Sequence, residues 1–284
     1  MSQLTKEASR GAGMLPKDSL VAWHLSAGIA VLMLLQSVTG LVLPELYRDV
    51  DWVTAAWYGN DFVTALVAVP LMVWALMAVR RGSRRAELVW YSMLGYCVYN
   101  YAFYLFGAQL NWFFPVYAVL FAMPVFALIL ALSRVDAVQI ASEFSGKTPI
   151  KWISGYMLFT GIGLAIAWIV QWLNFMLTGA VPDVGEEGFR LIASLDLSYI
   201  VPWFILGAVL LLRRQPWGYI IAMIITMKGA TYTLVLTSAS TVGALRGIEG
   251  SLEQIPVWAA WTLAGGLAVW GLLRSLQPAA KNGT

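Results

Sequence analysis

The sequence has very few of the residues on which disulfide-bonded proteins and metal proteins depend. Its 284 residues include one cysteine, Cys97, and one histidine, His24. A lone cysteine excludes an intramolecular disulfide, and a lone histidine excludes a metal or haem site that needs two histidines. The sequence also lacks a P-loop pattern. We therefore expect no metal and no cofactor, and the sequence favours a protein that is not an enzyme without deciding the point.

Charged residues are also scarce. They make up 12% of the chain, well below the roughly 25% typical of soluble domains. Hydrophobic residues make up 60%, and the mean hydropathy is +0.73. This composition predicts an integral membrane protein, and the absence of a long polar segment predicts a single membrane domain. The basic residues lie in short clusters beside apolar runs, where they set topology, so we expect no binding of nucleic acid.

Eight apolar runs are long enough to cross a bilayer, since a transmembrane helix needs about 20 residues. They lie at 20–43, 62–80, 87–107, 112–133, 150–178, 193–212, 217–240 and 255–273. The sequence therefore predicts an all-α, polytopic membrane bundle of about eight transmembrane helices. The expected divisions are a cytoplasmic N-terminal segment at 1–19, a transmembrane domain at 20–273 and a cytoplasmic tail at 274–284.

The connections between these runs differ in charge from one side to the other. Of the 18 basic residues, 14 fall on one side, 3 fall on the opposite side, and Lys228 lies within a run. By the positive-inside rule, both termini are expected in the cytoplasm. The first run lacks a small-residue cleavage site, so we interpret it as a retained helix. The expected location is the bacterial inner membrane, with the lipid bilayer as a partner and the oligomeric state left open.

Lys228 is the most unusual residue of the sequence, because it interrupts the apolar stretch "IIAMIITMKGATYTLVL". A charged lysine near the bilayer centre costs from about 3 to more than 10 kcal/mol, so it is normally paired, neutral or next to a wet cavity. Counted from Trp217 at about 1.5 Å per residue, Lys228 lies about 16 Å into the membrane. Counted from Trp90 in the same way, Asn100 lies about 15 Å deep. The two residues are expected to share one layer.

No carboxylate is expected at the depth of Lys228. By helical rise, Asp196 lies about 25 Å and Asp61 about 28 Å from the cytoplasmic edge. The short link "RRQPW" makes the helices of Asp196 and Lys228 neighbours, so the sequence predicts a stretched pair between them. Snorkelling of the lysine to an interface is the alternative.

Polar side chains share the layer of Lys228 in two other helices. In the run 87–107 they form one stripe at helical spacing, from which Tyr99 and Tyr101 are expected to point away. Such a lining suits a small anionic or carbonyl-bearing ligand, with the ammonium as its counter-charge, whereas contacts between helices are the alternative use. The predicted ligand-binding residues are Lys228, Asn100, Tyr96, Tyr104, Tyr232, Thr231, Gln36 and Asp196.

Two stretches, "YNYAFYLFGAQLNWFFPVYAVLFAMPVFAL" and "PWGYIIAMIITMKGATYTL", carry a family resemblance. They resemble segments of uncharacterised bacterial multi-pass membrane proteins that have a Tyr-Asn-Tyr helix and a later Lys-Gly helix. The resemblance implies a membrane protein and supplies no reaction, cofactor or substrate.

Three functions fit these features. The favoured one is binding or transport of a small molecule in an intramembrane cavity around Lys228, which agrees with many spans and with prolines that kink them. Against transport stands the lack of a convincing inverted repeat. The second function is a sensor or enzyme in which neutral Lys228 forms a Schiff base with an aldehyde. The third is a structural membrane partner. The sequence identifies neither the ligand nor a direction of transport.

Overall fold

The computed structural model describes residues 17–182 and 184–277, and this part of the chain is helical, without a β-sheet. An isolated bridge between Phe144 and Leu276 is its one strand-like feature. The prediction of an all-α fold is confirmed. Most of the expected terminal segments, residues 1–16 and 278–284, lies outside the described residues.

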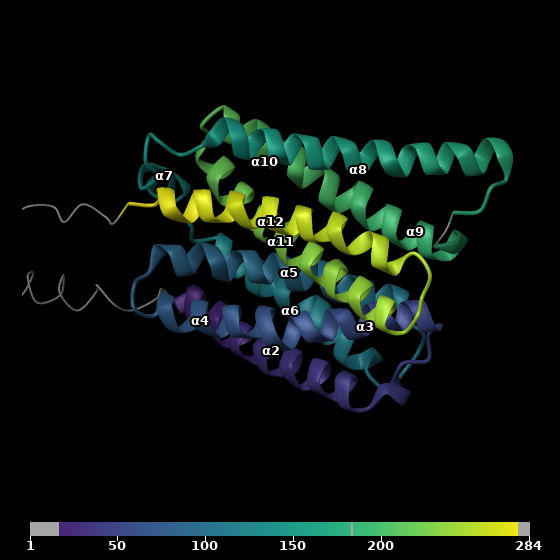
Figure 1. Ribbon diagram of the computed structural model, residues 1–284. Helices are drawn as coiled ribbons and strands as arrows, with labels where there is room; N and C mark the ends of the chain where they lie inside the picture. The colour runs from purple at the N-terminus through teal and green to yellow at the C-terminus, as the bar shows by residue number, and fades with distance from the viewer. Residues whose placement is uncertain (1–16, 183, 278–284) are drawn as a thin grey trace, which may run out of the picture.

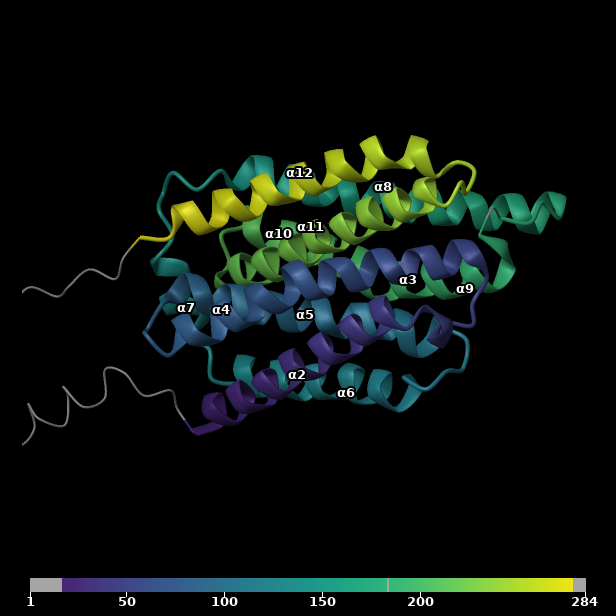
Figure 2. The ribbon, with the colours of Figure 1, turned by 60° about the horizontal axis from the view of Figure 1, so that its bottom comes forward.

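The long helices lie side by side in one bundle (Figure 1, Figure 2). Two of them are composite, in that the π segments η2 and η3 each join two α-helices. The elements are α2 (Lys17–Val42), η1 (Pro44–Leu46), α3 (Asp51–Val63), η2 (Thr64–Ala68), α4 (Val69–Val79), α5 (Arg84–Gly107), α6 (Phe114–Leu132), α7 (Ala137–Ser142), α8 (Ile150–Thr178), α9 (Gly185–Leu195), η3 (Asp196–Ile200), α10 (Val201–Leu212), α11 (Pro216–Leu245) and α12 (Ser251–Ser275).

Seven helices of the described residues are long and apolar enough to cross a membrane. Two of them start well before the runs predicted at 62–80 and 193–212. They begin at Asp51 and Gly185, because polar turns extend each helix beyond the apolar residues that mark it in the sequence.

The remaining expected run, 87–107, forms α5, but α5 is not among these seven helices. Its 24 residues would span about 36 Å, so length does not exclude a crossing. Its composition is more polar, with charged residues in its first turn and several tyrosines. Most of its residues are buried, and it packs against α4, α6 and α11 in the middle of the bundle (Figure 2). A helix covered by its neighbours does not need an apolar surface, so the polar composition of α5 does not exclude a crossing. That α5 crosses the membrane stays a prediction.

Two composite helices change from α to π geometry at the same place relative to a proline. The π segment η2 ends two residues before Pro70, and η3 ends two residues before Pro202. Proline lacks an N–H and its ring clashes with the carbonyl four residues earlier, and a π-bulge relieves that clash. Pro124 lies inside α6, which stays α-helical throughout. A buried carboxylate accompanies each π segment: Asp61 shortly precedes η2, and Asp196 opens η3.

The helices α3 and α11 approach each other closely at Gly59. A Cβ atom added to Gly59 would overlap the backbone of Ala239. We therefore expect Gly59→Ala to lower the free energy of unfolding by about 1–3 kcal/mol, because the two helices must move apart. Thermal unfolding in detergent measures this change.

Gly163 on α8 provides the matched control, because nothing lies within 4 Å of an added Cβ there. Gly163→Ala is expected to be neutral or to stabilise by up to about 1 kcal/mol, since alanine has the higher helix propensity. Equal unfolding temperatures for both variants would contradict the close packing at Gly59.

Candidate functional site

Lys228 lies inside the bundle with 3% of its surface exposed. Its Nζ atom is 3.1 Å from the ring centroid of Tyr99 on α5 and 4.6 Å from that of Tyr232, one turn further along α11. The face of an aromatic ring attracts an ammonium group. The side chain therefore stays among aromatic rings inside the bundle and does not extend to an interface.

Asp196 is the carboxylate that accompanies the lysine. It is buried, and it accepts hydrogen bonds from the Tyr99 hydroxyl and, at 2.9 Å, from Nε1 of Trp168 on α8. Among the described residues, no carboxylate oxygen lies within 4.0 Å of the lysine Nζ, although Asp196 is near enough to interact with the lysine electrostatically. Tyr99 joins the two groups, because its hydroxyl binds the carboxylate while its ring faces the ammonium. We call Lys228, Asp196, Tyr99 and Tyr232 the lysine site.

Tyr99 is the contact that sequence reasoning missed. The polar stripe of α5 was expected to face Lys228 through Asn100, with Tyr99 pointing elsewhere. The structure reverses this arrangement, because α5 directs Tyr99 toward Lys228 on α11 and Asn100 toward Asn60 on α3. The position of Tyr99 directly beside Asn100 was the feature of the sequence that could have predicted its contact with Lys228.

Asn100 belongs to a second cluster, which lies between α5 and the composite helix α3–η2. Its Oδ1 atom accepts a hydrogen bond from Nδ2 of Asn60 at 2.8 Å, while its own Nδ2 atom is buried without a hydrogen-bond partner. The hydroxyl of Tyr96 lies 3.3 Å from Oγ1 of Thr64 and 3.4 Å from Oδ1 of Asn60. We call these four residues the Asn60 cluster. Asn100 is hydrogen-bonded to α3 and forms no hydrogen bond with Lys228, so a shared site of the two residues stays a prediction.

A third cluster surrounds Asp61, whose exposed fraction is 0%. One carboxylate oxygen accepts a hydrogen bond from the Tyr47 hydroxyl at 2.5 Å. The other accepts hydrogen bonds from the Tyr104 hydroxyl at 2.8 Å and from Nε2 of Gln36 at 3.0 Å. Tyr101 extends the network by donating to Oε1 of Gln36 at 3.1 Å. These five residues, the Asp61 cluster, hold a buried carboxylate with three donors and no basic partner within ion-pair distance among the described residues.

The predicted site residues are thus divided among three clusters. Gln36 and Tyr104 lie in the Asp61 cluster, where their side chains bind the carboxylate of Asp61. Thr231 directs its hydroxyl to the carbonyl of Met227 on its own helix, at 2.9 Å. Tyr232 packs edge-on to Tyr99, with ring centroids 4.9 Å apart. Of the predicted residues, the structure therefore brings Asp196 and Tyr232 together with Lys228.

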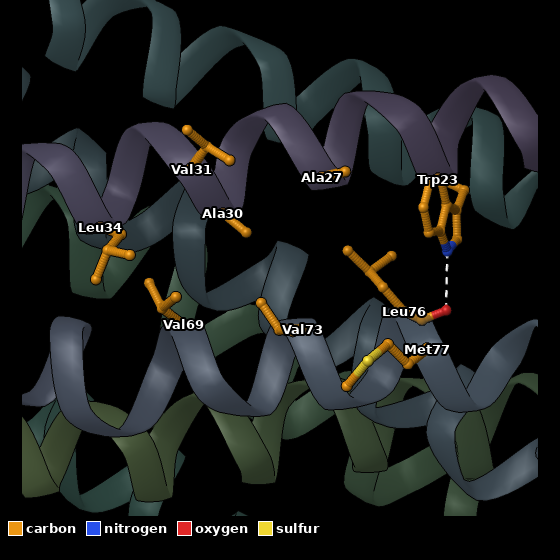
Figure 3. Close-up of a pocket in the computed structure, with 9 residues that line it drawn as sticks. All are labelled: Trp23, Ala27, Ala30, Val31, Leu34, Val69, Val73, Leu76 and Met77. Atoms are coloured by element: carbon orange, nitrogen blue, oxygen red, sulfur yellow. Dashed lines mark hydrogen bonds between the residues drawn. The ribbon is translucent and has the colours of Figure 1, made fainter.

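Two surface hollows lie elsewhere. One, of about 290 Å³, is a groove between α2 and α4 (Figure 3). The other, of about 440 Å³, lies between the C-terminal half of α8 and α9, with Glu186 and Arg190 among its lining residues. Lys228 lines neither of them. In this conformation the rings of Tyr99 and Tyr232 occupy the space next to its ammonium.

Comparison with known proteins finds no match to a protein-family model, to a curated protein or to a solved structure. What the protein does must therefore be inferred from the chemistry of the three clusters.

Proposed function

We propose that the protein is an integral membrane protein of the bacterial inner membrane that binds or transports a small anionic or carbonyl-bearing molecule at the lysine site. The proposal includes about eight crossings, with α5 as the third, and both termini in the cytoplasm. The observation that carries it is the environment of Lys228, a buried lysine that has aromatic faces and a nearby carboxylate but, among the described residues, no direct ion pair.

When it is protonated, such a lysine has N–H donors that no acceptor among the described residues uses. Its three N–H donors can each form a charge-assisted hydrogen bond, which is roughly twice as strong as a neutral one. Holding a charge inside a bilayer is expensive, and membrane proteins keep intramembrane charges mainly at ligand, ion or proton sites. A ligand carboxylate or carbonyl would supply the direct partner that Asp196 does not supply.

The composite helix α9–η3–α10 offers a route for the ligand. Asp196 opens η3, and Tyr99 and Trp168 hold its carboxylate from α5 and α8. A π segment followed by proline weakens the hydrogen-bond ladder of its helix, and π-bulges are common at functional sites. Movement of α10 relative to α9 would shift Asp196 and open the space beside the ammonium. Interrupted helices at the substrate site are also frequent in membrane transporters.

A Schiff-base function is the second candidate. The proximity of Asp196 supports it, since a buried carboxylate near Lys228 would serve as the counter-charge of a protonated imine. The aldehyde would have to displace the rings of Tyr99 and Tyr232 from the lysine. An absorbance spectrum of the purified protein separates a bound chromophore from reversible binding.

Lys228→Met tests both candidates, with Lys151→Met at the exposed start of α8 as the control. Thermal stability is measured in detergent across a panel of small carboxylates, phosphates and carbonyl compounds, with a spectrum of each sample. We expect a compound that stabilises the wild type and Lys151→Met to bind Lys228→Met about tenfold more weakly, which corresponds to about 1.4 kcal/mol.

The possible outcomes of this experiment are distinct. Loss of a visible absorbance band in Lys228→Met would favour the Schiff base. If Lys228→Met responds to every compound as the wild type does and has the same spectrum, the lysine is a packing residue and the proposed ligand site is wrong.

A further inference from the structure

The groove between α2 and α4 is formed by one stripe of side chains from each helix (Figure 3). On α2 the stripe includes Trp23, Ala27 and Leu34, and on α4 it includes Val73 and Met77. All the residues that line the groove are hydrophobic in type. The indole nitrogen of Trp23 donates a hydrogen bond to the carbonyl of Leu76 at 2.9 Å, so the one polar side-chain atom of the lining is satisfied.

Small side chains explain why the groove exists. Ala27 and Ala30 lie about one turn apart on α2, and their small side chains leave space between α2 and α4. Trp23 to Leu34 spans eleven residues of helix, or about 16 Å, which is about half of a hydrocarbon core of about 30 Å. The groove therefore has the length of one leaflet.

A positive charge lies at one end of the groove. The guanidinium carbon of Arg80 is 4.9 Å from the ring centroid of Trp23, and Arg80 and Arg81 are both exposed directly after α4. Stacking on the indole orients the guanidinium and leaves its N–H donors unused. Among the described residues, no carboxylate oxygen lies within 4.0 Å of the Arg80 guanidinium.

We infer that this groove binds one acyl chain of an anionic phospholipid, with the lipid phosphate held by Arg80. The charge at Arg80 favours an anionic headgroup, because a guanidinium binds phosphate oxygens in a bidentate manner and a basic residue near an anionic membrane surface contributes about 1 kcal/mol. The inference rests on the proposed membrane location and is independent of the lysine site. By the proposed topology, the headgroup belongs to the cytoplasmic leaflet.

Native mass spectrometry of the detergent-purified protein tests the inference. Phosphatidylglycerol and phosphatidylcholine of equal chain length are added separately, and inorganic phosphate serves as a headgroup-only probe. We expect phosphatidylglycerol to bind in preference to phosphatidylcholine, and inorganic phosphate not to bind. Arg80→Gln should weaken phosphatidylglycerol binding roughly fivefold. Arg213→Gln, at the end of α10 and outside the groove, should leave it unchanged.

A second variant tests the groove itself. Ala27→Leu should reduce binding of phosphatidylglycerol, because the larger side chain occupies the path of the acyl chain. Equal retention of both lipids, or no effect of Arg80→Gln, would overturn the inference. Binding that responds to Arg80→Gln but not to Ala27→Leu would place the lipid outside the groove and overturn it as well. If Ala27→Leu fails to fold, Arg80→Gln decides the matter.

Membrane fractionation separates this inference from the proposal on which it rests. A protein that alkaline carbonate washes out of the membrane fraction would overturn the membrane location itself. A protein that stays in the membrane fraction but shows no preference for phosphatidylglycerol would overturn the lipid site alone.

Discussion

Asp61→Ala is expected to lower the free energy of unfolding by about 3 kcal/mol, because three buried donors lose their carboxylate acceptor at once, and Tyr104 and Gln36 keep only longer hydrogen bonds, to the carbonyl of Trp57 and the hydroxyl of Tyr47. The donors are the hydroxyls of Tyr47 and Tyr104 and the amide of Gln36, and all three residues come from different segments of the bundle. Each buried donor without a partner costs about 1–3 kcal/mol. Chemical or thermal unfolding in detergent micelles measures the loss.

Two further variants make this prediction specific. Asp61→Asn keeps one acceptor oxygen, so we expect about half of the loss caused by Asp61→Ala. Asp51→Ala removes an exposed carboxylate in the first turn of α3, and it should change stability by no more than about 1 kcal/mol. If Asp61→Ala were as stable as Asp51→Ala, the Asp61 cluster would contribute nothing to the fold.

Asp196→Ala is expected to have the second large effect, a loss of about 3–5 kcal/mol. It leaves the Tyr99 hydroxyl and the Trp168 N–H without their acceptor, and it removes the carboxylate that balances Lys228. Lys228→Met should cost less than about 1 kcal/mol or even stabilise the protein, because it removes a buried charge while Asp196 keeps both donors. A much larger loss of stability for Asp196→Ala than for Lys228→Met would show that Asp196 compensates the charge of Lys228. Equal losses would show that the two side chains only pack against their neighbours.

A double-mutant cycle completes the experiment. Combining Asp196→Ala with Lys228→Met should recover at least about 1 kcal/mol relative to Asp196→Ala alone, because the lysine is then no longer buried without a counter-charge. Glu187→Ala, exposed in the first turn of α9, is the control and should be close to neutral. Additive effects of the two substitutions would show that the charges do not interact.

The sequence predicts the helical architecture well because long apolar runs are a strong and local signal. It also predicts that Asp196 lies near Lys228, since a short link forces α10 and α11 to be neighbours. It does not predict the division into three clusters. The helical period of α5 places Asn100 on one stripe and Tyr99 beside it, but which neighbour covers each face depends on the order in which the helices pack.

The burial of Asp61 could not be predicted from the sequence either. The apolar run that marks its helix begins at residue 62, so the sequence places Asp61 at the outer end of a span. The helix begins at Asp51, about three turns earlier, and Asp61 is fully buried. Local hydropathy identifies where a chain is apolar, whereas burial of a polar residue depends on partners such as Gln36 and Tyr104 that come from other helices.

The polar contacts of α5 with Asn60 and with the lysine site also affect the order in which the helices can pair during synthesis. A polar helix enters the bilayer from the translocon at a cost that neighbouring helices can offset. Asn60, the partner of Asn100, has already been synthesised when α5 emerges, so this face of α5 can pair at once. The partners of Tyr99 are Asp196 and Lys228, which the ribosome adds much later. In the proposed topology, membrane insertion of α5 therefore depends first on α3, and the lysine site is completed only when the second half of the chain has been inserted.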